Sequence, residues 1–218
     1  MQVNNMLEND MKLKWNEIAA ELKEISQKGL AFSKDKYDID RYTRLQEISV
    51  DMFSESSGIP RDEILQTFQS DTGYPTPRTD CRGVVFKDEK ILLVKEIEDG
   101  GWTLPGGWCD NGLTGSENVV REVWEESGYE VEVKNLMGVL DRDKHGSHPT
   151  YPYNVYKLFY KCEIIGGEAK ASDETSEVRF FGEDEIEDLQ LSEARTKFYQ
   201  LKWMFDLKRN PVVHAVFD

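Results

Sequence analysis

Residues 106–129 read GGWCDNGLTGSENVVREVWEESGY, and this stretch decides the fold. It places Glu122, Glu125 and Glu126 at relative positions i, i+3 and i+4, which share one side of an α-helix because each residue turns by about 100°. Like charges at that spacing repel each other. A divalent cation makes the same spacing favourable, because hard ions such as Mg²⁺ take oxygen ligands. The three carboxylates therefore predict a metal site on a helix.

The same stretch carries start and stop signals for that helix. Thr114 and Glu117 have the spacing of a capping box, and Gly128 is the predicted end. The pair Gly106–Gly107 permits a close approach of the backbone to a ligand. The apolar side of the helix, which would be buried, is expected to consist of Val120, Val123 and Trp124.

The segment resembles the Nudix box, whose pattern reads Gly, five residues, Glu, seven residues, then Arg-Glu-aliphatic-x-Glu-Glu-x-Gly-aliphatic. Gly107 takes the first position, and residues 121–129, REVWEESGY, supply the last nine. Leu113 stands where the pattern has its first Glu, and Tyr129 replaces the final aliphatic residue. The family role of position 113 is therefore unavailable here. The resemblance implies an α/β fold, the α/β/α sandwich of the family with its mixed sheet.

The resemblance also implies the chemistry of the site. Arg121 is expected to orient a neighbouring carboxylate with its planar guanidinium, a surface ion pair being the alternative. The general base stays open between Glu174 and Glu177, in an acidic stretch that is equally compatible with a solvated loop. The predicted catalytic set is Arg121, Glu125, Glu174 and Glu177. The predicted ligands of Mg²⁺ or Mn²⁺ are Glu122, Glu125, Glu126 and the carbonyl of Gly107.

Substrate recognition is predicted in a loop after the box. Arg142, Lys144 and His145 would meet phosphate groups there, with His148 and Tyr151 nearby for a nucleotide base. The alternative is that these loop residues have no role. Trp108, beside the glycine pair, is a second candidate for stacking on a base. Trp102 is expected in the core, because it lies on a strand with Leu104.

The amino-terminal region has a helical pattern. We predict a helical domain over residues 1–70, a linker over 71–80 that contains Gly73, Pro75 and Pro77, and a Nudix hydrolase domain over 81–218. The first helix should end at Gly29, the second should begin near Asp38 and the third should follow Pro60. The predicted inner residues of the first two helices are Trp15, Ile18, Ala19, Leu22, Ile25, Ile39, Tyr42, Leu45, Ile48, Met52 and Phe53.

After the linker the pattern becomes one of strands. Residues 81–86 and 91–96 flank a predicted hairpin turn at 87–90. Further strands are expected over 130–140, 153–165 and 177–181, where Val, Tyr and Phe are frequent. A helix over 189–207 is predicted to close the chain.

Composition limits the function classes. The 218 residues carry a formal charge of -15, with 42 acidic and 27 basic residues, which opposes nonspecific attraction to nucleic-acid phosphates. Cys81, Cys109 and Cys162 are too few and too scattered for a disulfide framework or a zinc site. No apolar run approaches the ~20 residues of a membrane span, and the start lacks a signal-peptide pattern. We therefore expect a cytoplasmic protein that binds no membrane and has no nonspecific attraction to nucleic acid, unless a local basic patch or bound cations offset its charge.

The wider resemblance is to Nudix members with an amino-terminal helical extension, described as ADP-ribose or CDP-choline pyrophosphatases. Residues 29–49 and 141–160 contribute to it. It implies a homodimer that hydrolyses a small-molecule nucleoside diphosphate derivative linked to a group X. Two alternatives remain: an enzyme that processes RNA ends, and a catalytically silent Nudix domain that senses a nucleotide, which only Leu113 favours.

Overall fold

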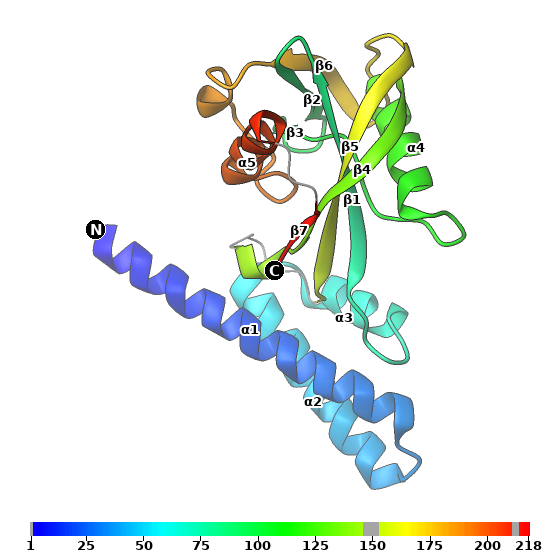
Figure 1. The fold of residues 1–218 in the computed structure, drawn as a ribbon. Coiled ribbons are helices and arrows are strands. Elements are labelled where there is room, and N and C mark those ends of the chain that lie inside the picture. Colours follow the sequence, from blue (N-terminus) through cyan, green and yellow to red (C-terminus); the bar gives the residue numbers. More distant parts are fainter. Residues whose placement is uncertain (1, 146–152, 211–213) are drawn as a thin grey trace. The chain divides into compact units, whose positions relative to one another are not determined.

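The computed structural model describes residues 2–145, 153–210 and 214–218, with side chains from Trp15 onward. The chain falls into two compact units: the first ends at Pro77 and the second begins at Arg78, while Tyr153 and Asn154 group with the first. The first unit is built from helices, and the second from a sheet with helices on it (Figure 1).

The three helices of the first unit confirm the predicted helical region. They are α1 (Gln2–Phe32), α2 (Lys36–Ser57) and α3 (Arg61–Ser70). Asp35 caps α2, since its carboxylate accepts hydrogen bonds from the backbone N–H groups of Tyr37 and Asp38 at 3.0 and 3.2 Å. The core of this unit consists of Ala19, Val50, Phe53, Ile64 and Phe68.

The predicted end of the first helix at Gly29 is wrong. α1 continues through Gly29 to Phe32. Gly29 lies where α1 approaches α2 closely, because a Cβ atom there would lie 2.3 Å from the ring of Tyr42. The glycine therefore provides a close helix–helix approach instead of a helix end.

Part of the predicted inner side of these helices is also wrong. The contact between α1 and α2 includes the small residues Ala19 and Ser49, whose hydroxyl donates to the carbonyl of Ala19 at 2.6 Å. Trp15 and Ile25 are 54% and 44% exposed, and Ile39 and Ile48 are exposed as well.

The second unit contains a mixed seven-stranded sheet. Its strand order is β3-β2-β1-β5-β4-β7, and β6 pairs with β2 outside that path. β1 runs parallel to β5, and β4 runs parallel to β7, while the other pairs are antiparallel. The strands are β1 (Arg78–Lys87), β2 (Lys90–Glu96), β3 (Trp102–Thr103), β4 (Tyr129–Asp141), β5 (Val155–Gly167), β6 (Thr175–Phe181) and β7 (Val216–Phe217).

Two helices cover opposite sides of this sheet (Figure 1). Helix α4 (Gly115–Ser127) packs on one side through Val119 and Val123, and α5 (Phe198–Arg209) packs on the other through Leu201 and Met204. The predicted α/β fold with a mixed sheet between helices, preceded by a helical region, is thereby confirmed. β1 begins at Arg78, inside the segment 71–80.

The predicted hairpin and strands are confirmed, whereas the closing helix is wrong in its first half. α5 begins only at Phe198, after a short 3-10 helix at Ile186–Asp188. Between them Leu191 forms a bridge with Trp102, and the N–H of Ser192 donates to the Trp102 carbonyl at 3.0 Å. The backbone groups of this segment are therefore hydrogen-bonded to β3 and are not available to continue a helix.

Candidate active site

Helix α4 has the predicted limits. The Thr114 hydroxyl accepts from the N–H of Glu117 at 3.2 Å, the Glu117 carboxylate accepts from the N–H of Thr114 at 2.8 Å, and Gly128 ends the helix in the left-handed conformation. Val123 is buried as expected, but Trp124 is 55% exposed. The buried partner of Val123 is Val119, one turn earlier on the same side, whereas Trp124 lies about 100° further round.

Glu126 is the most enclosed of the three glutamates, with 6% of its surface exposed. Its carboxylate accepts a hydrogen bond from the N–H of Gly106 at 2.8 Å. Burial raises the pKa of Glu126 to about 8, although Arg82 and the Gly106 N–H act in the opposite direction. The cost of burying this carboxylate therefore outweighs the favourable effect of Arg82 and of the Gly106 N–H.

Glu122 and Glu125 are linked to Arg121. The guanidinium donates to Glu122 at 2.8 Å and to Asp110 at 2.6 Å, and its Nε lies 3.7 Å from a carboxylate oxygen of Glu125. Burial raises the pKa of Glu122, whereas the Arg121 hydrogen bond lowers it. Glu125 is half exposed. Arg121 thus donates to Glu122 and lies within ion-pair distance of Glu125, and its orienting role stays a prediction.

The glycine pair brings the backbone against these carboxylates. Gly106 has a φ of 141°, and a Cβ atom there would lie 2.0 Å from the carbonyl oxygen of Cys81. A Cβ atom on Gly107 would lie 2.9 Å from a carboxylate oxygen of Glu122. The carbonyl of Gly107 accepts from the N–H of Cys81 at 2.9 Å. A side chain at either glycine would displace the loop from the site.

The donors of this site suit a hard divalent cation in kind. Carboxylates and a backbone carbonyl are the ligands that Mg²⁺ and Mn²⁺ prefer, and burial raises the pKa of Glu126. Among the described residues, however, no three His, Cys, Asp or Glu side chains converge as a finished metal centre. Glu125, which also pairs with Arg121, is the least buried of the three helix carboxylates.

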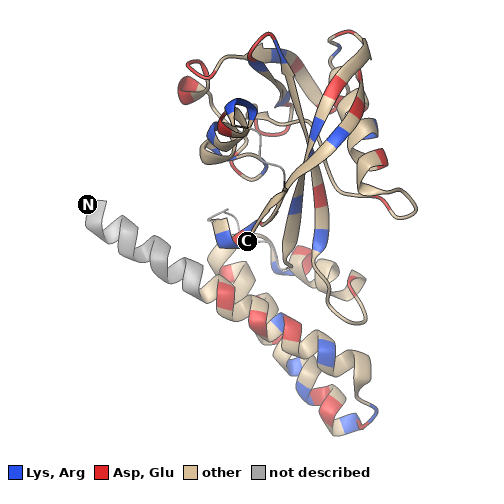
Figure 2. Ribbon diagram, viewed as in Figure 1, with Lys and Arg blue, Asp and Glu red and all other residues tan. Residues whose placement is uncertain are grey.

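Sequence reasoning missed a buried set of charges beside the box. Arg82 donates to both carboxylate oxygens of Asp80 at 2.8 and 2.7 Å and to the carbonyl of Leu104 at 3.1 Å. The charge of Arg82 also acts on Glu126. The available signal is the alternation of Asp80 and Arg82 along one strand, but Asp80 falls within the predicted linker over 71–80. Figure 2 shows both signs of charge on the central strands.

Two further cations belong to this set. The ammonium group of Lys157 is buried and donates to the carbonyl of Arg195, and burial lowers its pKa to about 7. The guanidinium of Arg195 lies 3.2 Å from Glu96, which is itself buried. Each of these charges has an opposite charge or a backbone carbonyl within reach, as buried ions require.

The two candidates for the general base lie at the start of β6. Glu174 and Glu177 are both exposed, and Glu177 pairs with Lys95 at 2.7 Å. The hydroxyl of Thr175, between them, donates to the carbonyl of Glu126 at 2.7 Å. β6 is therefore attached to the end of the box helix, but within the described chain neither carboxylate forms a hydrogen bond or ion pair with the box residues.

Three of the predicted substrate residues, Arg142, Lys144 and His145, lie in one short segment at the 3-10 helix Asp143–His145. Arg142 is buried and pairs with Asp143 at 2.8 Å, Lys144 is exposed, and His145 pairs with Asp218 at the carboxyl end. Trp108 is 44% exposed. Trp102 is 8% exposed and packs edge-on against Phe181, which confirms its place in the core. His148 and Tyr151 lie outside the described residues.

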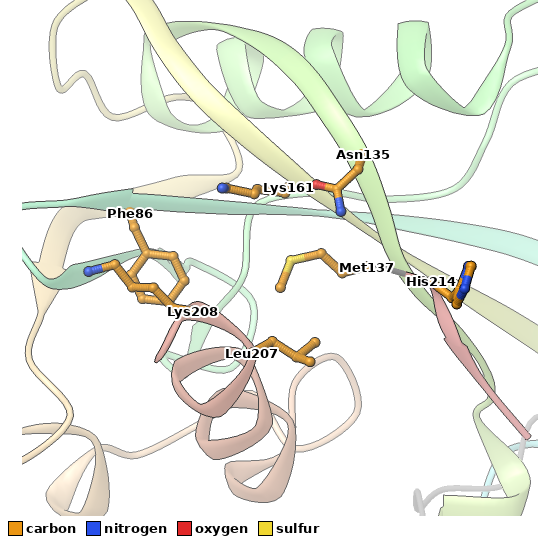
Figure 3. A pocket seen from close by; sticks show the side chains of 7 residues that line it. All are labelled: Phe86, Asn135, Met137, Lys161, Leu207, Lys208 and His214. Carbon is orange, nitrogen blue, oxygen red and sulfur yellow. The ribbon is translucent and has the colours of Figure 1, made fainter. Parts of the chain in front are cut away.

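A cavity of about 110 Å³ lies between the sheet and α5 (Figure 3). None of the box residues lines it. Its lining residues are Phe86, Asn135, Met137, Lys161, Leu207, Lys208 and His214.

Two family models match the chain. Residues 77–202 match the model of the NUDIX domain. The chain belongs to the Nudix family. Residues 13–68 match a second model, described as the UDP-X-like N-terminal oligomerisation domain. The predicted resemblance is confirmed, and the chain is a Nudix hydrolase.

Relatives agree with that assignment over most of the chain. A putative ADP-ribose pyrophosphatase, YjhB of Bacillus subtilis, is 44% identical over 208 residues, which cover 95% of this chain and 99% of the relative. The crystal structure of a UDP-X diphosphatase is 25% identical, with a TM-score of 0.59, over 94% of this chain and 98% of that one. An ADP-ribose pyrophosphatase from Streptococcus suis is 38% identical, with a TM-score of 0.57, over 66% of this chain and all of that one.

The described part of the chain contains no helix that is both long and apolar enough to cross a bilayer.

Proposed function

We propose that this Nudix hydrolase is a metal-dependent pyrophosphohydrolase that cleaves a nucleoside diphosphate linked to a group X, releasing a nucleoside monophosphate and phospho-X. The observation that carries the proposal is the box itself: Glu126 and Glu122 lie against the Gly106–Gly107 backbone, with Arg121 bonded to Glu122. ADP-ribose and CDP-choline are the leading substrates. The names of the relatives favour ADP-ribose and extend the set to UDP-linked compounds.

Each residue of the box has a proposed task. Glu122, Glu125, Glu126 and the carbonyl of Gly107 would hold Mg²⁺ or Mn²⁺, which polarises phosphoryl oxygens and lowers the pKa of bound water. Arg121 would fix the direction of the Glu122 and Glu125 carboxylates. Glu174 or Glu177 would accept the proton of the attacking water, from the loop and strand that Thr175 attaches to the box helix. Arg142, Lys144, His145 and Trp108 remain the proposed substrate contacts.

A substrate panel tests the proposal. We expect hydrolysis of ADP-ribose, CDP-choline or a UDP-sugar with Mg²⁺ or Mn²⁺, loss of activity in EDTA, and recovery when the cation is restored. Glu126→Gln should lower activity at least ~100-fold, because it removes a charge directed at the reacting centre. Glu163→Gln, which changes an exposed glutamate on β5, is the matched control and should retain activity. Full activity in EDTA, or in Glu126→Gln, contradicts the mechanism. Cleavage of a labelled oligoribonucleotide alone would favour the RNA-end alternative instead.

We also propose a homodimer formed through the amino-terminal helices. Their match to an oligomerisation domain and the exposed apolar residues of α1 and α2, among them Trp15 and Ile25, support it. Light scattering should give twice the mass of the chain. Trp15→Glu should shift the mass toward that of the monomer, whereas Glu17→Gln on the same helix should not. A monomeric mass for the unaltered protein contradicts the proposal.

A further inference from the structure

The glycine loop lies along β1 like an extra strand. Three backbone hydrogen bonds join them: Cys81 N–H to the Gly107 carbonyl at 2.9 Å, Gly83 N–H to the Pro105 carbonyl at 2.8 Å and Cys109 N–H to the Thr79 carbonyl at 2.9 Å. Asp80 and Trp108 form the antiparallel bridge between them. In this register Cys81 faces Gly107 directly, and Cys109 is its diagonal neighbour on the same face.

Both cysteines pack into the layer between β1 and α4. Cys81 is completely buried, Cys109 is partly exposed, and both are free thiols that lie beside each other. Gly107 has no side chain to separate them. The third cysteine, Cys162, is opposite Val85, four residues further along β1 and thus about 13 Å from Cys81.

We propose that Cys81 and Cys109 are a modification site, at which a hydroperoxide forms a reversible intramolecular disulfide. The thiol of the partly exposed Cys109 would react with the hydroperoxide to give a sulfenic acid and an alcohol, or water when the oxidant is hydrogen peroxide. The Cys81 thiol then attacks the sulfenic sulfur and expels water, so that two thiols are oxidised and one peroxide bond is reduced. A dithiol reductant reverses the step by thiol–disulfide exchange.

The disulfide would change the candidate active site, a consequence that rests on the proposed function. A disulfide requires Cα atoms within about 6.8 Å, whereas diagonal neighbours in a sheet are typically about 7–8 Å apart. The loop must therefore move toward Cys81. Gly106, which donates to Glu126, and Gly107, which lies against Glu122, are in that loop. A displacement of the glycine loop by the difference between these two Cα separations predicts a loss of activity of roughly 10- to 100-fold.

The test uses the full chain with hydrogen peroxide as the oxidant. After treatment and quenching, alkylation under denaturing conditions should find one reactive thiol in place of the three cysteines. The intact mass should be lighter by two hydrogen atoms, and peptide mapping should join the peptides of Cys81 and Cys109 and leave Cys162 alkylated. Activity should fall and should return with dithiothreitol. Cys109→Ser, compared with its own untreated sample, should keep its activity, and Cys162→Ala should respond like the unaltered protein.

The outcomes separate this inference from the proposed function. Three thiols after treatment, a disulfide that includes Cys162, or a sulfinic acid on Cys109 without a crosslink would overturn the modification site, whatever the enzyme hydrolyses. A Cys81–Cys109 crosslink that leaves turnover unchanged would overturn its effect on the loop. The crosslink is measured by mass. It can therefore be confirmed or contradicted even if the protein hydrolyses none of the substrates in the panel.

Discussion

Both faces of β1 are buried, but one face is apolar and the other is charged. On the α4 side, Cys81, Gly83 and Val85 pack into an apolar layer, and a Cβ atom on Gly83 would already lie 2.3 Å from Val123. On the other side, at the same end of the strand, the buried residues are Asp80 and Arg82. Burial alone therefore does not distinguish a core from a site, whereas the polarity of alternate residues does.

The charged face is not an efficient way to stabilise a fold. Replacing a buried ion pair by apolar residues of similar volume is often neutral or stabilising. The pair must therefore be explained by something other than packing, and its position offers a reason. Burial tends to lower the pKa of Arg82, but Asp80 raises it, and Arg82 in turn acts on Glu126 and Glu96. We interpret this face as the internal counter-charge of the box.

Breaking the charged face should have the largest effect on stability. Arg82→Met leaves the buried carboxylate of Asp80 without its two hydrogen bonds. We expect a loss of about 3 kcal/mol in the free energy of unfolding, the lower end of the usual range for half of a buried pair, because Lys157 and Arg142 also act on Asp80. Urea unfolding followed by tryptophan fluorescence measures it.

The double variant Asp80→Leu, Arg82→Met is the matched control. It removes both charges and should recover at least half of the loss, because neither member of the pair is left buried without the other. A double variant that is less stable than Arg82→Met would show that the pair contributes more than the cancellation of its own charges.

The pH dependence of stability should identify the same face. Burial lowers the pKa of Lys157 to about 7, from an ordinary value of 10.5. Between those two values the unfolded chain binds more protons than the folded one, so stability should rise with pH, by at most about 1.4 kcal/mol per unit from this group. Unfolding of the unaltered protein and of Lys157→Met at pH 7, 8 and 9 measures the difference between them. That difference should shift in favour of the unaltered protein as pH rises, and a constant difference contradicts the interpretation.

The two faces also show which features of the structure could be predicted from the sequence and which could not. Helix α4 was predictable from end to end, because Thr114, Glu117 and Gly128 act through local backbone hydrogen bonds. The burial of Asp80, Arg82 and Lys157 was not predictable. A charged residue in a strand ordinarily indicates a solvent-exposed position, and only the fold reveals which groups compensate its charge. The failed half of the closing helix has the same origin: the carbonyl of Gln190 and the N–H of Ser192 form hydrogen bonds with Trp102, about ninety residues away in the chain.

Crowding the apolar face should have a smaller effect than breaking the charged one. Gly83→Ala adds a methyl group 2.3 Å from Val123 Cγ2, so α4 or β1 must move. We expect a loss of about 1–3 kcal/mol, the usual cost of overpacking. Val123→Ala makes room for the methyl group, so the double variant should lose clearly less than the sum of the two single variants. Strict additivity in urea unfolding would mean that the two side chains do not meet.

Loosening the helix that covers the apolar face should have the smallest effect. Thr114→Ala removes the hydroxyl that accepts the Glu117 N–H, but it leaves the packing of Val119 and Val123 untouched. The expected loss is about 1 kcal/mol, typical of an N-cap, and Thr114→Ser should restore it because serine offers the same acceptor. Hydrogen exchange should quicken in the first turn of α4 and stay unchanged at Glu126, whose turn is held by Gly106 and Thr175. Faster exchange along the whole helix would instead show that the cap, and not the β1 layer, keeps the box in place.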